Sequence, residues 1–349
     1  MKSATLRFLL LNLLTFSYGF SAFSSPVIRE HSYSSRLFIS EHDDSLMVEN
    51  RRETASDSTS GTKRVSILLC PAQFCVPADY KCFFDTIKTI SDNDTNAVEI
   101  GTCRVAPLPR TEWIKVAKQL PTKNFFDATL EPNETLQWYF DAIEEGLMDI
   151  FAEEGDDAEI CIIGHSIGGW VARAYLGGLS QSSKAVHRLI IDNCRSFVTL
   201  GTPHSSPASA LVDQTRGLLK RVEVTKSCSA ESLQRSGIQV TCVGSRAIEG
   251  KIPFSNVEEL VALTSYVPLS GKFGANGDGI IPEELAFMEE PAKRIVLEKC
   301  SVTNNAVRHA HVLPTPWNLW DGYAPSIALP DDFCWYGSDG VVEQWIEAI

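Results

Sequence analysis

Short apolar runs alternate with longer amphipathic stretches over most of the chain from residue 64 onward. A near-continuous apolar run closed by a turn residue is typical of a strand buried on both faces of a sheet. On this pattern we predict strands over Arg64–Cys70, Asn96–Ala106, Glu159–Gly164, Ser196–Leu200, Gln239–Gly244 and Arg294–Leu297. Amphipathic spacing predicts helices over Thr111–Gln119, Thr135–Glu153 and Ile167–Leu179. The alternation predicts an α/β fold with a mostly parallel central sheet and helices on both faces.

The first 63 residues carry a different pattern. Lys2 and Arg7 precede the apolar run Phe8–Phe16, which is too short to span a hydrocarbon core of ~30 Å as a helix and indicates a signal peptide over residues 1–22. Residues 23–63 are rich in hydroxyl side chains and then mixed in charge, a composition that cannot build a core. We therefore predict a transit-peptide-like leader and linker there, and one folded domain over residues 64–349.

The junction at Ser21–Phe23 resembles the two-part plastid leader of algae with a secondary plastid. In such leaders a transit peptide that begins with an aromatic residue follows the signal peptide. Here Phe20 stands where that pattern has its first alanine. The resemblance implies a plastid location. An ordinary secretory signal is the alternative, and it would place the protein in the endoplasmic reticulum or outside the cell.

Charge and cysteine content narrow the class of partner. The formal net charge of −13 argues against a nucleic-acid partner and against electrostatic docking on an anionic membrane. The ten cysteines include no C-x-x-C pair, so we predict neither a zinc site nor a thioredoxin-like motif. Cysteines inside apolar runs, such as Cys70 and Cys161, are expected to be small buried hydrophobes, and a disulfide would require an oxidising lumen. No apolar run of ~20 residues occurs after residue 30, so we predict no transmembrane helix in the mature chain.

The segment Gly164–Gly169 (GHSIGG) lies directly after a predicted strand and directly before a predicted helix. A nucleophilic serine at the tip of such a turn has a strained backbone and needs neighbours without side chains two positions away, which Gly164 and Gly168 provide. The helix that follows presents free N–H groups and a positive dipole end to a developing oxyanion. In this context we predict that Ser166 is a nucleophile and that the chain has the α/β-hydrolase fold.

A serine nucleophile needs a histidine base and a carboxylate that orients it, in the chain order serine, acid, histidine for this fold. The histidines far enough downstream are His309 and His311, and both follow the last predicted strand. Spacing alone does not choose between them. Asp278, between two glycines on a loop before an apolar pair, is the candidate acid. For the oxyanion hole we predict the backbone N–H groups of Gln73, in the loop after the first strand, and Ile167.

Several segments of the chain resemble a known group of proteins. Gly164–Trp170 (GHSIGGW) and Val198–His204 (VTLGTPH) are similar to segments of lipase-like α/β-hydrolases, which include the GPI inositol-deacylases. A closer resemblance is to plastid-type hydrolases of plants, algae and cyanobacteria, carried by Cys70–Phe74, Trp138–Tyr139, Asp213–Leu219, Gly277–Gly279 and Trp335–Ser338. The resemblance implies that the base lies in a segment whose counterpart here is Val307–Ala310, which favours His309. Arg308 and Ala310 depart from the residues usual in that segment.

Together these features predict an esterase that cleaves a lipid or other apolar acyl ester through an acyl-enzyme. No metal or organic cofactor is implied, and residues 205–237 are expected to form a cap that sets substrate choice. Three aromatic residues in Val312–Asp332 are candidates for peripheral membrane contact, although packing of a surface loop also explains them: Trp317, Trp320 and Tyr323. The alternatives are a GPI inositol-deacylase-type activity in the endoplasmic reticulum and a non-catalytic binding module with the same fold.

Overall fold

The computed structural model describes residues 64–93, 98–211, 213–313, 322–330 and 332–349. The predicted signal peptide, transit-peptide-like leader and linker lie outside the described residues, as do Trp317 and Trp320. The plastid location therefore stays a prediction.

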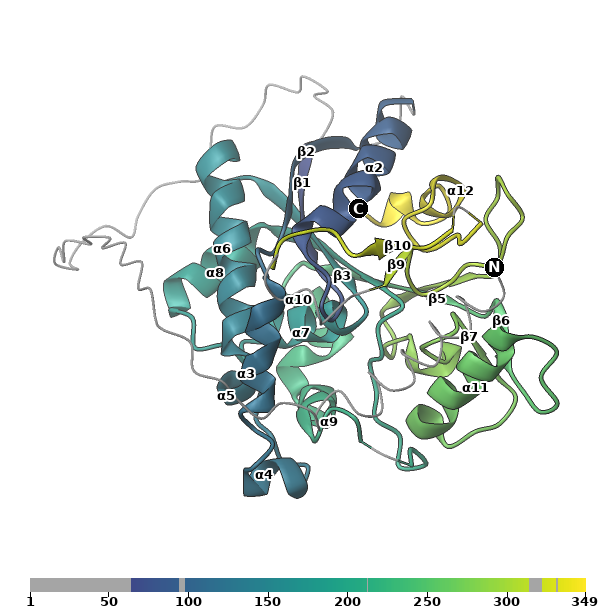
Figure 1. The fold of residues 1–349 in the computed structure, drawn as a ribbon. Coiled ribbons are helices and arrows are strands. Elements are labelled where there is room, and N and C mark those ends of the chain that lie inside the picture. The colour runs from purple at the N-terminus through teal and green to yellow at the C-terminus, as the bar shows by residue number, and fades with distance from the viewer. Residues whose placement is uncertain (1–63, 94–97, 212, 314–321, 331) are drawn as a thin grey trace, which may run out of the picture.

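A six-stranded sheet lies at the centre of the molecule, with strand order β2-β1-β3-β4-β5-β8 and every neighbouring pair parallel (Figure 1). Its strands are β1 Arg64–Cys70, β2 Glu99–Val105, β3 Glu159–His165, β4 Cys194–Leu200, β5 Gln239–Ser245 and β8 Lys293–Leu297. Each strand coincides with one of the six apolar runs, so the predicted mostly parallel sheet is confirmed. Parallel strands bring their carboxyl ends to one edge, where loops from distant parts of the chain meet.

Helices cover both faces of this sheet (Figure 1). The main helices are α2 Lys81–Asn93, α6 Gln137–Glu154, α7 Ile167–Leu176, α8 Lys184–Asn193, α9 Leu218–Val224, α10 Ala230–Arg235 and α11 Val257–Ser270. Single turns of α-helix are α3 Ile114–Ala117, α4 Lys123–Phe126, α5 Pro132–Thr135 and α12 Asp339–Val342. Turns of 3₁₀ helix are η1 Pro77–Tyr80, η2 Arg110–Trp113, η3 Lys226–Cys228, η4 Glu283–Leu285 and η5 Ile346–Ala348.

Strand β1 shows how the sheet separates two cores. Leu68 and Cys70 belong to a core with side chains of α6, α7 and α8, whereas Val65, Ile67 and Leu69 belong to a second core with α2 and α12. The alternation follows from the two-residue period of a strand. Because both faces are covered, all of these strand residues are apolar, which is why the strand was recognisable as a run rather than as an alternation.

Two predicted helices end differently in the structure. The stretch Thr111–Gln119 contains most of the 3₁₀ turn η2 and then α3, and α3 ends at Ala117 because the next amides bond carbonyls only three residues back, as Gln119 N–H does to Val116 O at 3.0 Å. The helix predicted over Ile167–Leu179 ends at Leu176, because Gly178 adopts a positive φ of 76° that stops the helix.

The connection between β5 and β8 forms a small lobe that the sequence pattern did not reveal. Strands β6 Ile248–Gly250 and β7 Ala275–Gly277 pair antiparallel, and α11 packs against them through Ala262 and Tyr266. The lobe ends at Gly277, so the hairpin places the next residue, Asp278, at the carboxyl edge of the main sheet. A further short pair, β9 Val312–Leu313 with β10 Ile327–Ala328, follows the last sheet strand.

Residues 205–237 connect β4 to β5. Their second half forms α9, η3 and α10, whose buried side chains, Leu219, Val222 and Leu233 among them, join the same core as α6 and α7. The first half is a loop, in which the Asp213 carboxylate accepts hydrogen bonds from the N–H groups of Thr215 and Gly217. Among the residues that the structure describes, no helix is long and apolar enough to cross a membrane.

Candidate active site

Ser166 occupies a sharp turn between β3 and α7. Its backbone has φ 55° and ψ −126°, a conformation that costs a non-glycine residue of order 1–3 kcal/mol. The turn is tight because its neighbours lack side chains: a Cβ on Gly164 would lie 2.2 Å from the Cα of Gly169, and one on Gly168 would lie 2.1 Å from the carbonyl oxygen of Cys70. The strain projects the Ser166 hydroxyl away from the sheet edge, into the space where other loops converge.

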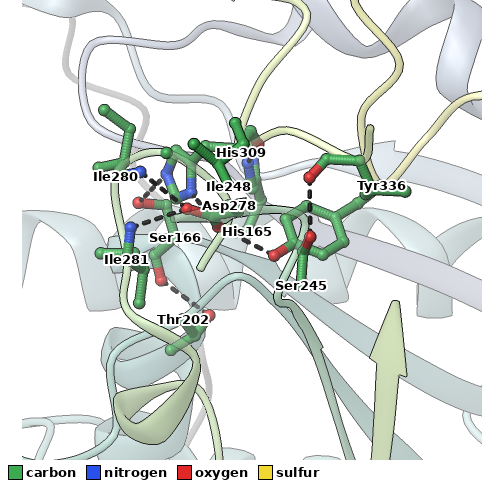
Figure 2. Close-up of polar contacts among 12 residues, drawn as sticks. His165, Ser166, Thr202, Ser245, Ile248, Asp278, Ile280, Ile281, His309 and Tyr336 are labelled. Carbon is green, nitrogen blue, oxygen red and sulfur yellow. Dashed lines mark hydrogen bonds and ion pairs between the residues drawn. The ribbon is translucent and has the colours of Figure 1, made fainter. Parts of the chain in front are cut away.

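Thr202, just beyond β4, holds this turn in place. Its hydroxyl oxygen lies 2.9 Å from the carbonyl oxygen of Ser166 and 3.3 Å from that of Gly164, and it donates to them (Figure 2). A Cβ on Gly169 would lie 2.0 Å from the Thr202 hydroxyl oxygen, so only glycine fits there. Sequence reasoning reached Thr202 only through the resemblance to lipase-like proteins.

His309 and Asp278 complete a hydrogen-bonded chain that starts at Ser166 (Figure 2). The Oγ of Ser166 lies 3.0 Å from His309 Nε2, and His309 Nδ1 lies 2.7 Å from Asp278 Oδ2. The backbone N–H of His309 also donates to the backbone carbonyl of Asp278 at 3.0 Å. Because a carboxylate only accepts, Nδ1 carries the ring proton and Nε2 is free to accept the serine proton. The structure thus brings together the three residues predicted as nucleophile, base and acid.

The Asp278 carboxylate is buried but fully hydrogen-bonded. Oδ1 accepts from the N–H groups of Ile280 (2.9 Å) and Ile281 (2.7 Å), and Oδ2 accepts from His309 and from the hydroxyl of Tyr336 (2.9 Å). These donors replace the hydrogen bonds to water that the carboxylate loses on burial. Sequence reasoning missed the role of Tyr336, although the residue lies inside one of the segments that carried the family resemblance.

His311, the alternative base, lies elsewhere. Its Nε2 donates to the carbonyl oxygen of Asp79 at 2.7 Å, and its ring stacks on Trp335 with centroids 3.9 Å apart. The chain bends at His309, so two residues further on the side chain no longer shares a face with it. Geometry therefore separates the two histidines that spacing alone left equivalent.

His165 links His309 to the loop after β1. Its Nε2 lies 2.9 Å from the carbonyl oxygen of His309, which can only accept, so this nitrogen carries the proton. Its Nδ1 then accepts from the Tyr80 hydroxyl at 2.9 Å, and the Tyr80 oxygen accepts from the N–H of Ala72 at 2.9 Å. Burial, followed by the neighbouring His309, holds the pKa of His165 well below its ordinary value, as this pattern of a neutral ring requires. Tyr80 and His165 thereby connect His309 to Ala72, the residue preceding Gln73.

This link predicts a positioning role for Tyr80. Replacing Tyr80 by phenylalanine leaves the Ala72 N–H and His165 Nδ1 unpaired, so we expect about a tenfold fall in kcat with little change in KM, and a stability loss of about 1–2 kcal/mol. Ester turnover and thermal melting measure the two effects. Tyr175→Phe is the matched control, because its hydroxyl contacts Glu144 outside the site. Equal kinetic losses in both variants would argue against the positioning role.

The two predicted oxyanion donors lie on neighbouring segments. Ile167 is the first residue of α7, where helical amides lack an internal acceptor, and Gln73 lies in the turn after β1. Gly168 approaches the carbonyl oxygens of Cys70 and Pro71 so closely that the β1 loop packs on the start of α7. Among the described residues, neither the Gln73 N–H nor the Ile167 N–H has a hydrogen-bond acceptor. Both donors remain available to a substrate oxygen.

Buried neutral histidines make the stability of the protein pH-dependent. Burial lowers the pKa of His165 and His204 well below 6.5 and lowers that of His311 as well. As pH falls below 6.5, these histidines become protonated in the unfolded chain but stay neutral in the folded protein, so the free energy of unfolding decreases. We expect the free energy of unfolding to fall by about 2–4 kcal/mol from pH 7 to pH 5.5. Urea unfolding at both values tests this, with a shallower slope expected for His311→Ala; equal stability at the two values would contradict it.

Fold and site geometry define the class of this protein. A serine on a strained strand–helix turn, with acid and histidine following in chain order on a parallel sheet, makes it an α/β-hydrolase superfamily protein, a hydrolase that acts on ester bonds. Residues 133–293 match the family model of the PGAP1-like alpha/beta domain. The matched range contains Ser166 and Asp278 and ends before His309. The predicted membership of the α/β-hydrolase superfamily is confirmed, and the resemblance to plastid-type hydrolases stays a prediction.

Comparison with solved structures gives weak likenesses. One is the RedJ thioesterase from the prodiginine biosynthetic pathway in Streptomyces coelicolor, with 9% identity and a TM-score of 0.26 over 71% of this chain and 87% of that chain. Another is tomato methylketone synthase I complexed with 2-tridecanone, with 11% identity and a TM-score of 0.25 over 81% of this chain and 93% of that one. At these scores the likenesses add nothing to the assignment. The search of curated proteins finds no match.

Proposed function

We propose that this protein is a serine esterase that cleaves the carboxylic ester of a lipid or another apolar acyl compound through an acyl-enzyme. The observation that carries the proposal is the hydrogen-bonded chain from the Ser166 hydroxyl through His309 to Asp278. A serine hydroxyl becomes nucleophilic when a histidine accepts its proton and a carboxylate holds that histidine in the accepting tautomer.

In the first half-reaction the Ser166 oxygen attacks the ester carbonyl carbon while His309 Nε2 takes the hydroxyl proton. The carbonyl oxygen becomes an oxyanion, which the N–H groups of Gln73 and Ile167 stabilise by roughly 3–4 kcal/mol each. Collapse of this intermediate breaks the bond to the alcohol oxygen, which receives the proton from His309. In the second half-reaction His309 deprotonates a water molecule that attacks the acyl-enzyme, and Ser166 leaves with its proton restored.

We assign substrate choice to the β4–β5 connection, residues 205–237. Support comes from its position: it begins directly after Thr202, which holds the serine turn, and its loop packs on the stretch that follows α4. The Leu130 N–H donates to the carbonyl oxygen of Arg216 at 3.1 Å, and Gly217 approaches the carbonyl oxygen of Ala128 so closely that a Cβ would lie 2.1 Å from it. A loop so placed is suited to contact the acyl or alcohol group beside Ser166.

A second candidate is removal of an acyl chain from an inositol ring, the activity of the GPI inositol-deacylases that the sequence resembles. The match of residues 133–293 to the PGAP1-like alpha/beta domain favours it, since that range includes the serine turn. The two candidates share the acyl-enzyme chemistry and differ in the alcohol released. Comparing release of fatty acid from acyl-inositol and from simple alkyl esters separates them.

A fluorophosphonate probe tests the proposal directly, because it reacts covalently with an activated serine. We expect the wild-type protein to be labelled on the peptide containing Ser166, and labelling to be absent in Ser166→Ala. Ser180→Ala, a serine whose hydroxyl contacts Ser182 in a loop after α7, is the matched control and should be labelled like the wild type. Absence of labelling in a folded wild-type protein would favour the non-catalytic binding module instead.

Turnover of p-nitrophenyl esters of increasing acyl length tests the substrate class. An apolar acyl site predicts that kcat/KM rises from acetyl to longer chains, because each buried methylene is worth about 0.8 kcal/mol. A preference for acetyl over every longer chain would overturn the apolar-acyl part of the proposal and leave the serine chemistry intact.

A further inference from the structure

Cys300 and Cys334 are 34 positions apart in the chain but lie close together in the structure. Cys300 begins a tight turn after β8, in which its N–H donates to Asn305 and its carbonyl accepts from Asn304. Cys334 precedes Trp335 and Tyr336. Both cysteine side chains are buried in the core that contains α2 and α12. The turn itself is at the surface, since the four residues after Cys300 are exposed.

Cys300 and Cys334 lie close enough together for each thiol to affect the pKa of the other. The hydroxyl oxygen of Thr303 lies 3.0 Å from Cys334 Sγ, so the turn that begins at Cys300 packs against the Cys334 sulfur atom. Burial raises the pKa of the Cys300 thiol, but hydrogen bonds from Thr303, Val302 and Cys334 outweigh it and bring that pKa below its ordinary value. Burial and the nearby Cys300 raise the pKa of Cys334. A thiol of lowered pKa beside a second thiol is the arrangement that thiol–disulfide exchange uses.

We propose that Cys300 and Cys334 are a redox modification site that forms a reversible disulfide, with a small-molecule disulfide such as oxidised glutathione as the oxidant. The Cys300 thiolate attacks one sulfur of the oxidant, which forms a mixed disulfide and releases the first thiolate. Cys334 then loses its proton and attacks Cys300 Sγ, which expels the second thiolate. The pair gives up two electrons and two protons, and the oxidant becomes two thiols.

This disulfide would fasten two segments that position the catalytic groups. The carbonyl of Cys334 accepts from the N–H of Arg308 at 2.8 Å, next to His309, and two residues beyond Cys334 the Tyr336 hydroxyl donates to Asp278. Cross-linking fixes both segments in the arrangement that the hydrogen bonds already hold. The disulfide therefore stabilises the loops that carry His309 and Asp278 and leaves the geometry at Ser166 unchanged.

Mass spectrometry of the intact protein and its peptides tests the proposal. The purified protein is incubated with excess oxidised glutathione and then with dithiothreitol, and each state is alkylated and digested. We expect a disulfide-linked peptide pair containing Cys300 and Cys334 that disappears on reduction. We also expect a rise in Tm of roughly 5 °C on oxidation, since the bond closes a loop of about 35 residues in the unfolded chain. The oxidised and reduced wild-type proteins should show equal kcat at 25 °C.

Cys334→Ser and Cys300→Ser should each lose the linked peptide and the Tm rise. Cys82→Ser is the matched control, because Cys82 is exposed and is the thiol that glutathione reaches first; this variant should keep both effects. The comparison of oxidised with reduced wild type needs no variant, so it remains decisive if a serine variant folds poorly. Glutathione adducts at Cys82 without any link between Cys300 and Cys334 would overturn the proposal, as would a linked peptide pair without a rise in Tm.

Discussion

Replacing His309 by alanine should lower kcat for ester hydrolysis by about 10⁶-fold, whereas replacing His311 should leave kcat within about threefold of wild type. His309 is the group within hydrogen-bonding distance of the Ser166 hydroxyl, at 3.0 Å. Without it the serine proton has no acceptor, and the leaving alcohol has no donor. Steady-state turnover of a p-nitrophenyl ester measures both variants, and the fluorophosphonate labelling rate should follow the same order.

The two histidine variants control for each other. His311→Ala removes a hydrogen bond to the Asp79 carbonyl and a stacking contact with Trp335, so it is expected to lower Tm while sparing the chemistry. His309→Ala takes one hydrogen-bond donor from the buried Asp278 carboxylate, so it should also lower Tm, and both variants are therefore assayed at a temperature where they are folded. Loss of activity in His311→Ala at a temperature where the variant is folded, with activity kept in His309→Ala, would show that the base assignment is wrong.

The sequence predicted the sheet and the serine turn well because both depend on local pattern. Buried parallel strands appear as uninterrupted apolar runs, and the serine turn requires glycines at fixed positions whatever the rest of the chain does. The order of serine, acid and histidine then limited the partners to a few residues. Asp278 followed from its glycine neighbours, although the lobe that positions it was invisible in the pattern. Its strands, β6 and β7, are three residues each, too short to give a periodic signal.

The remaining site residues could not be predicted, because their roles arise from contacts between distant segments. Tyr80 and His165 are 85 positions apart, and Tyr336 and Asp278 are 58 apart. A buried tyrosine has the same local pattern whether its hydroxyl meets a backbone carbonyl or a catalytic carboxylate. The local pattern likewise gives no role to His165, inside the segment Gly164–Gly169. Its role is visible only when the carbonyl of His309 is seen to lie against it.

Replacing Asp278 by asparagine should lower kcat by about 10⁴-fold while the fold is kept. The Oδ1 position accepts two backbone N–H groups, from Ile280 and Ile281, so the oxygen of the new amide must occupy it. The amide nitrogen then occupies the Oδ2 position and points its N–H toward His309 Nδ1. That ring nitrogen has to become the acceptor, the proton moves to Nε2, and His309 can no longer take the proton of Ser166.

Tyr336→Phe is the comparison that separates this tautomer effect from a simple weakening of the acid. It removes the other donor to Oδ2 and leaves the charge and the His309 contact in place, so we expect a loss of kcat of about tenfold or less. Activity close to wild type in Asp278→Asn would mean that another group orients His309. Each of the other acids near this loop, Glu283 and Glu284, is engaged with a surface cation, Arg246 or Lys272, and neither contacts the base.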